Sequence, residues 1–141
     1  MGRNGDEMTT RARYLASYHA SVGAVTNVVQ TFTAGQAGAT EPLSETGAFT
    51  FNFDNDQNFI VTLGGNITFT NPTTENVGQS GIIVLVQGGS GSYTLSLGTD
   101  YETVGGTGIT LSTAVGAVDV LPYFIKATDS IQLGAPQLAF S

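Results

Sequence analysis

The chain of 141 residues lacks cysteine and tryptophan, and it has a single histidine, His19. Without cysteine it can form no disulfide and offers no thiolate for a zinc or iron–sulfur site. A catalytic triad would have to use His19, which has no second histidine to share a metal with. We therefore expect no catalysis, no metal centre and no cofactor.

Positive charge is scarce and unevenly placed. Three of the four basic residues are Arg3, Arg11 and Arg13, and none occurs from Tyr14 to Ile125. The formal net charge is −7. Nucleic acids and anionic membranes attract basic surfaces, so we expect the body of the protein to bind neither.

Long apolar runs are also missing. No segment approaches the roughly 20 apolar residues of a membrane helix, and no apolar stretch follows the polar segment Met1–Thr10. The sequence therefore predicts synthesis in a cytoplasm without a secretory signal. The length fits one domain.

Glycine and short apolar alternations are abundant. The chain has 19 glycines, is 40% hydrophobic and is only 11% charged, a composition typical of strands joined by glycine-rich turns. Phe49–Phe53 alternates strictly, with three phenylalanines on one face, which is the signature of a half-buried strand and predicts that these phenylalanines belong to the core. We predict an all-β fold, an antiparallel, jelly-roll-like β-sandwich with an N-terminal arm or short helix. The strands expected from alternation and β-branched residues are 22–33, 49–53, 59–63, 67–70, 82–87, 93–97, 109–111, 117–125, 131–133 and 138–140.

Several details of this organisation can be tested. Residues 1–33 are expected to form an attachment arm, 34–48 a linker loop and 49–141 the sandwich. The run GQSGIIVLVQGGSGSYTLSLG reads as a hairpin with a glycine-serine turn. Pro122 cannot donate a ladder hydrogen bond, so its strand should bulge there or lie at an edge.

Three acidic features are candidate sites. Asp54–Asn58 has the spacing that begins a calcium loop, but it lacks the later glycine and glutamate, which favours a polar turn. Asp100 and Glu102 would share one strand face, as glycoside hydrolysis requires, although a solvated loop is the simpler interpretation. Asp119 lies in an apolar strand and is expected either to face outward, to cap the adjacent loop or to take part in a subunit contact.

Two further groups are candidate contacts. Tyr101 and Tyr123 are candidate glycan contacts because tyrosine rings stack on sugars. The arginines Arg3, Arg11 and Arg13, with Tyr14 and Tyr18, are candidate attachment residues for an acidic protein surface. The glycine clusters at 88–91 and 105–108 precede strands rather than a helix and contain no lysine, so we interpret them as turns and not as phosphate loops.

From Phe51 onward the motif order resembles a recurrent module of tailed-bacteriophage virion proteins. The matching pieces are NITFTNP (Asn66–Pro72), GQSGIIVLVQ (Gly78–Gln87), the Gly89–Gly91 turn and TLSTAVGAVDV (Thr110–Val120). Such modules occur in tail fibres, capsid-attached fibres and decoration proteins. The resemblance implies β-sandwich domains, frequent homotrimers and no catalysis. Leu97 stands near a tryptophan position of the family, which disfavours sugar binding.

These observations together predict a structural virion protein, most simply a capsid decoration or head-fibre protein at the particle surface, made in the host cytoplasm. Its expected partners are other virion proteins and further copies of itself in a homotrimer. A tail-fibre or tail-tip receptor-binding or adaptor protein is one alternative. A carbohydrate-binding module that recognises a host surface glycan is another.

Overall fold

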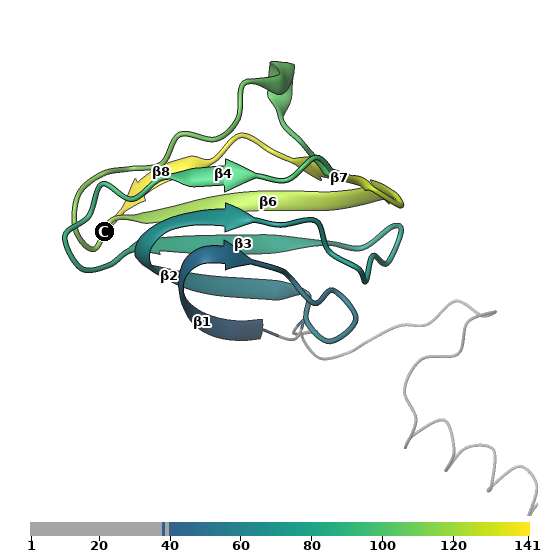
Figure 1. The fold of residues 1–141 in the computed structure, drawn as a ribbon, viewed down its shortest axis with the longest axis horizontal. Coiled ribbons are helices and arrows are strands. Elements are labelled where there is room, and N and C mark those ends of the chain that lie inside the picture. Colours follow the sequence, from purple (N-terminus) through teal and green to yellow (C-terminus); the bar gives the residue numbers. More distant parts are fainter. Residues whose placement is uncertain (1–37, 39) are drawn as a thin grey trace, which may run out of the picture. The chain divides into compact units, whose positions relative to one another are not determined.

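The computed structural model describes residues 38 and 40–141, which form an all-β unit (Figure 1). The strands are β1 (Thr40–Phe49), β2 (Asn58–Phe69), β3 (Ser80–Gln87), β4 (Leu95–Leu97), β5 (Tyr101–Glu102), β6 (Val118–Ala127), β7 (Ser130–Leu133) and β8 (Gln137–Phe140), with one 3-10 turn, η1 (Val104–Gly106). The expected N-terminal arm or helix and the strand 22–33 lie outside the described residues. Within the described part, no helix is long and apolar enough to cross a membrane.

All the described strands belong to one mixed sheet with the order β1-β2-β3-β6-β7-β5. In addition, β4 pairs with β2 and β8 pairs with β6. β2 is parallel to β1, β3 and β4, whereas β6 is antiparallel to β3, β7 and β8. The all-β prediction is confirmed, but the expectation of a purely antiparallel sheet is wrong.

The sheet curls because β2 and β1 bend together, as their curved ends in Figure 1 show. The first half of β2 pairs with β3 through Phe59–Leu63, and its second half pairs with β4 through Ile67–Phe69. The bend lies at Gly64 and Gly65, and a side chain at Gly65 would run into Thr46 of β1. The two glycines therefore do not end a strand, as the sequence suggested, but bend one continuous strand.

Strand β1 corrects the prediction that residues 34–48 form a linker loop. Its backbone follows β2 in register from Thr40 to Phe49, with one shift between Glu45 and Gly47. Gly47 has a φ of 77°, a conformation that glycine adopts without strain. The segment is polar because β1 lies at the edge of the sheet, and Pro42 is tolerated there. The β domain thus begins before Phe49.

The predicted hairpin is also wrong, because β4 pairs with the second half of β2 and not with β3. Gln87 is buried at the end of β3, and its side chain makes hydrogen bonds in place of the expected backbone bonds between the two hairpin strands. Its side-chain amide donates to the Tyr93 carbonyl over 2.8 Å and accepts from the Tyr93 N–H over 3.0 Å. The Gln87 side chain thereby pairs both backbone groups of Tyr93, so the following strand β4 can pair with β2 and not with β3.

Pro122 occupies a locally unpaired side of a central strand. Strand β6 pairs with β7 from Tyr123 onward and with β8 up to Val120, which leaves Pro122 between the two partners. Its carbonyl accepts from the Gly134 N–H over 2.9 Å, so its missing N–H faces that same gap. Strand β6 is an interior strand, and its pairing with β3 passes Pro122 without a register shift, so the predicted edge or bulge at Pro122 is wrong. The gap between β7 and β8 accommodates the missing N–H instead.

The core lies on the inner side of the curled sheet. It combines Val61 and Leu63 of β2 with Leu121 and Ile125 of β6 and a cluster of packed aromatic rings. Phe51 contacts Phe49, Phe53, Phe59 and Phe69, with ring centroids between 4.5 and 5.7 Å apart. Phe51 and Phe53 are buried as predicted, but they lie on a loop between β1 and β2 and not on a strand. Residues 109–111 likewise form no strand, although Leu111 joins the core.

Candidate functional site

The outward side of β2, β3 and β6 is an uncharged, largely apolar surface of the described unit, and we call it the outer face. Its members alternate with core residues along each strand. They are Ile60, Thr62, Ile82, Val84, Val86, Val118, Val120, Pro122 and Phe124. None of these side chains is charged.

The sheet register brings the outer-face residues together. Ile60 lies beside Val84, and Ile82 lies opposite Pro122. Ile60, Ile82 and Phe124 are 39%, 43% and 43% exposed. Single exposed apolar residues are common, but a contiguous uncharged patch on a sheet marks an interaction surface more often than chance placement. The outer face is therefore the candidate functional site.

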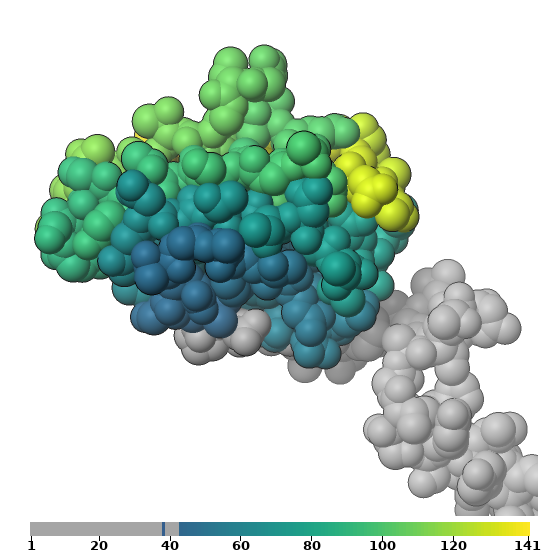
Figure 2. All heavy atoms as spheres, viewed as in Figure 1, coloured from purple at the N-terminus to yellow at the C-terminus, as the bar shows by residue number. Residues whose placement is uncertain are grey.

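A depression of about 500 Å³ borders the outer face where β6 meets β7. Its lining includes Glu102, Val104, Pro122, Phe124 and Gln132. Val104 of the η1 turn lines the depression, and this turn projects as a knob in the space-filling view (Figure 2). The depression thus joins an exposed aromatic ring to polar side chains at the margin of the apolar patch.

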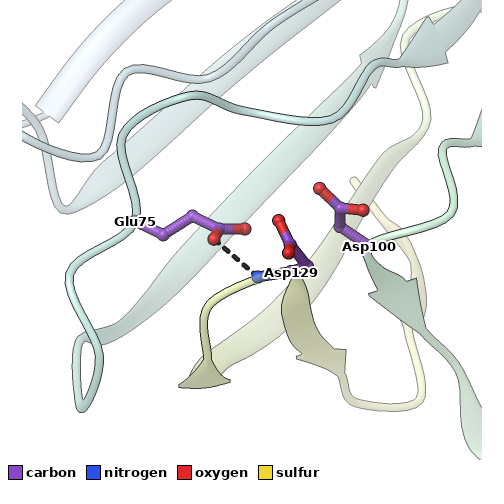
Figure 3. Close-up of side chains that lie close together, drawn as sticks. All are labelled: Glu75, Asp100 and Asp129. Atoms are coloured by element: carbon purple, nitrogen blue, oxygen red, sulfur yellow. Dashed lines mark hydrogen bonds between the residues drawn. The ribbon is translucent and has the colours of Figure 1, made fainter.

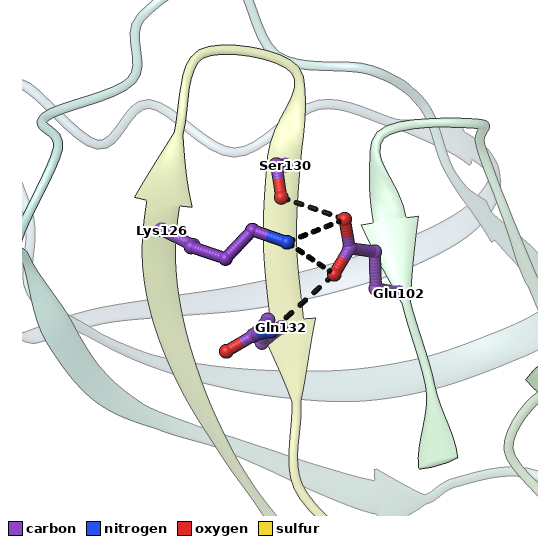
Figure 4. A network of polar contacts seen from close by, with 4 residues as sticks. All are labelled: Glu102, Lys126, Ser130 and Gln132. Carbon is purple, nitrogen blue, oxygen red and sulfur yellow. Dashed lines mark hydrogen bonds and ion pairs between the residues drawn. The ribbon is translucent and has the colours of Figure 1, made fainter. Parts of the chain in front are cut away.

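Glu102 organises that polar margin (Figure 4). Its carboxylate accepts from the Ser130 hydroxyl at 2.7 Å, from Lys126 Nζ at 3.1 and 3.2 Å, and from the Gln132 amide at 3.4 Å. The hydrogen bond from Ser130, followed by that from Lys126, lowers the pKa of Glu102 below its ordinary value. Lys126, the one basic residue of the described part, is therefore already paired.

Asp119 is a fully enclosed capping residue. It is 1% exposed, and its carboxylate accepts from the Ser112 N–H at 2.7 Å, the Ser112 hydroxyl at 2.6 Å and the Ala139 N–H at 2.9 Å. The interpretation as a loop cap is confirmed, and the outward-facing alternative is wrong. Because these hydrogen bonds fix both the preceding loop and β8, Asp119 holds the C-terminal strand on β6. The subunit contact stays a prediction.

Tyr101 and Tyr123 are core residues, which corrects the expectation that their rings are open to a glycan. Their hydroxyls donate to the carbonyls of Thr70, over 3.3 Å, and Gln57, over 2.7 Å. Burial raises the pKa of both hydroxyls, and for Tyr101 the nearby negative charges of Asp100 and Glu75 raise it further. The exposed aromatic ring beside the depression is instead Phe124.

The other two acidic features of the sequence have different outcomes. Asp54–Asn58 forms a polar turn before β2, in which the Asn52 side chain accepts from the Asp54 N–H over 3.1 Å. Asp100 and Glu102 do not form a pair: Asp100 is buried, whereas Glu102 is exposed and bound to Lys126. Asp100 instead gathers with Glu75 and Asp129 (Figure 3), neither of which the sequence pattern singled out.

The candidate attachment residues Arg3, Arg11, Arg13, Tyr14 and Tyr18 lie outside the described residues, as does His19. The comparisons with known proteins add no assignment: no family model, no curated protein and no solved structure matches the chain.

Proposed function

We propose that the chain is a structural protein of a tailed-bacteriophage virion, displayed on the capsid as a decoration or head-fibre protein. Its copies associate as a homotrimer through the outer face. The domain serves by shape and adhesion and catalyses no reaction. In this proposal the curled sheet is a variant of the jelly-roll-like sandwich of such modules.

The uncharged outer face is the observation that carries the proposal. Copies of a chain with net charge −7 repel one another unless they meet on a surface without charge. Ile60, Ile82 and Phe124 provide such a surface, because its nearest charges, Glu102 and Lys126, neutralise each other at the margin. A second copy is therefore the occupant whose chemistry fits best. Homo-oligomers close by symmetry, and a ring of three is the closed assembly that the family resemblance implies.

The motif order from Asn66 to Val120 supports the virion assignment. Several of its residues have structural roles in the described fold. Gln87, at the end of one motif, anchors the chain to Tyr93, and Asp119, in another, anchors β8. The motifs thus specify an architecture, which suits a protein that works as a building block.

The copy number of the protein in purified phage particles tests the location. Quantitative mass spectrometry against the major capsid protein should give a number that matches the capsid lattice. A number that matches the symmetry of the tail would move the protein to a tail fibre or tail tip. Absence from washed particles would contradict the proposal altogether.

Glycan binding is a second candidate function, and the depression beside Phe124 favours it. An exposed aromatic ring next to Glu102 and Gln132 resembles the pairing of a stacking platform with hydrogen-bonding groups that sugars require. A glycan array would then show binding that Phe124→Ala abolishes and Tyr101→Phe leaves intact. An array without signal for the full chain would exclude this function.

A further inference from the structure

Three carboxylates from separate loops meet in one small volume (Figure 3). Glu75 lies between β2 and β3, Asp100 precedes β5, and Asp129 lies in the β6–β7 turn. One oxygen from each lies within 4.8 Å of the others. Folding alone brings them together, since they are far apart in the sequence.

The surrounding backbone holds this arrangement in place. The Asp129 N–H donates to Glu75 Oε2 over 2.7 Å, and Asp129 has a φ of 56°. The Asp100 N–H donates to the Asn71 side chain over 3.3 Å, and the Asp100 carbonyl accepts from the Ile131 N–H over 2.7 Å. The loops are thus fixed with their carboxylates directed at one another.

No described cation balances this charge. Lys126 is the one basic residue of residues 38 and 40–141, and it binds Glu102. Like charges this close repel, and water screens them weakly where they are buried. Asp100 is buried, Glu75 is half-buried and Asp129 is exposed, so a cation between the three carboxylates would relieve their repulsion.

One oxygen of the cluster lacks the partner that buried groups normally have. Glu75 Oε1 is fully buried and accepts no hydrogen bond within the described part of the chain. Asp100 is 7% exposed, and its carboxylate accepts one bond, of 3.3 Å, from the Thr99 hydroxyl. Buried polar atoms are nearly always satisfied, so an orphaned carboxylate oxygen beside two further carboxylates indicates a missing ligand.

We propose that Glu75, Asp100 and Asp129 bind one calcium ion. Calcium takes six to eight oxygen ligands in flexible geometry, and water and backbone carbonyls commonly complete a set supplied by loops. Zinc prefers nitrogen and sulfur ligands, and magnesium demands near-ideal octahedral geometry, which makes both poorer matches to three loop carboxylates. The ion would tie together the β2–β3, β4–β5 and β6–β7 connections. The proposal is independent of the proposed function.

Calorimetric titration of the chelator-treated full chain with calcium chloride is the first test. We expect one ion per chain, a higher melting temperature with calcium, and a smaller response to magnesium. Asp129→Asn preserves shape and tolerates the positive φ, so it should remain folded and bind calcium about tenfold or more weakly. Asp54→Asn removes the same charge from the other acidic turn and should leave binding unchanged.

Terbium provides a readout at the site itself. It replaces calcium at oxygen sites, and its emission is excited through a nearby tyrosine, which Tyr101 provides because it directly follows Asp100 in the chain. Calcium should quench this emission by competition, and Tyr101→Phe should weaken the emission while calorimetric calcium binding persists. Absence of calcium binding by the wild-type chain at millimolar calcium would overturn the proposal. Binding that Asp54→Asn removes and Asp129→Asn retains would overturn it equally.

Discussion

The two sides of strands β2, β3 and β6 differ in what their apolar residues accomplish. On the inner side, Phe59, Ile83 and Leu121 are completely buried and pack into one core. On the outer face, Ile60, Ile82 and Phe124 are exposed by about two-fifths of their surface, although they belong to the same strands. The core explains why the chain folds, whereas the outer face contributes little to folding, and its apolar character points to association with other molecules.

Replacing Phe51 by alanine should have the largest effect on the isolated domain. Phe51 is 1% exposed and packs against other aromatic rings, so its loss leaves a cavity and should lower the free energy of unfolding by about 3–5 kcal/mol. Phe124→Ala, the matched change on the outer face, should lower it far less. Urea unfolding of the two variants compares the faces, and equal losses would show that the outer face is part of the folding core.

Replacing Asp119 by alanine should be the next largest change. The backbone N–H groups of Ser112 and Ala139 would lose a buried acceptor, which lowers the free energy of unfolding by about 3 kcal/mol. Ser112→Ala removes one hydroxyl bond and should cost about 1 kcal/mol. Chemical denaturation measures both values, and hydrogen exchange should show β8 loosened in Asp119→Ala. A neutral Asp119→Ala would mean that β8 is held by other contacts.

The buried residue Tyr101 should make the folded state less stable at alkaline pH. The pKa of Tyr101 is raised in the folded state by burial and by the charges of Asp100 and Glu75. The unfolded chain therefore loses this proton first, so stability is full below the ordinary tyrosine pKa of about 10 and falls as the pH rises above it. Tyr101→Phe should flatten the urea midpoint measured against pH in this range. If the urea midpoint of Tyr101→Phe fell with pH as steeply as that of the wild type, another group would be responsible for the alkaline loss of stability.

Glu102, at the margin of the outer face, should instead make the folded state less stable at acidic pH. This is the smallest effect that we expect. The pKa of Glu102 is lowered by hydrogen bonds from Ser130 and Lys126, so its contribution is present above the ordinary carboxyl pKa and disappears as the pH falls. Because Glu102 is solvent-exposed, we expect a small change. Glu102→Gln should slightly reduce the loss of stability between neutral and acidic pH, measured by thermal melts. A large effect would mean that the margin of the outer face is buried in an assembly.

Alternation along the strands predicted the core more reliably than the pairing of the strands. Phe51 and Phe53 were recognised as buried from their spacing alone, because a core phenylalanine leaves the same pattern on a loop as on a strand. The polar strand β1 was missed because Pro42 and Gly47 are typical of loops, and only the free edge of β2 makes that segment a strand. The pairing of β4 with β2 depends on the side chain of Gln87, which no periodicity indicates.

Some residues of the candidate sites could be predicted from the sequence, and others could not. Asp119 stood out because a carboxylate in an apolar strand must be satisfied, and its capping role was among the expected ones. Glu75 and Asp129 left no signal, since each is an ordinary turn residue until folding brings it to Asp100. The outer face was also hidden, because the run IIVLV of β3 has apolar residues on both faces, and only the folded structure shows which of them remain exposed.

The molar mass of the full chain in solution tests most directly whether the outer face is an assembly surface. Size-exclusion chromatography with light scattering should give three times the chain mass of 14.6 kDa for the wild type and for Ser96→Lys, which adds the same charge on the exposed side of β4. Ile82→Lys should give the mass of a single chain with an unchanged circular dichroism spectrum. A wild type that remains monomeric at high concentration, or an Ile82→Lys variant that assembles like Ser96→Lys, would contradict the account.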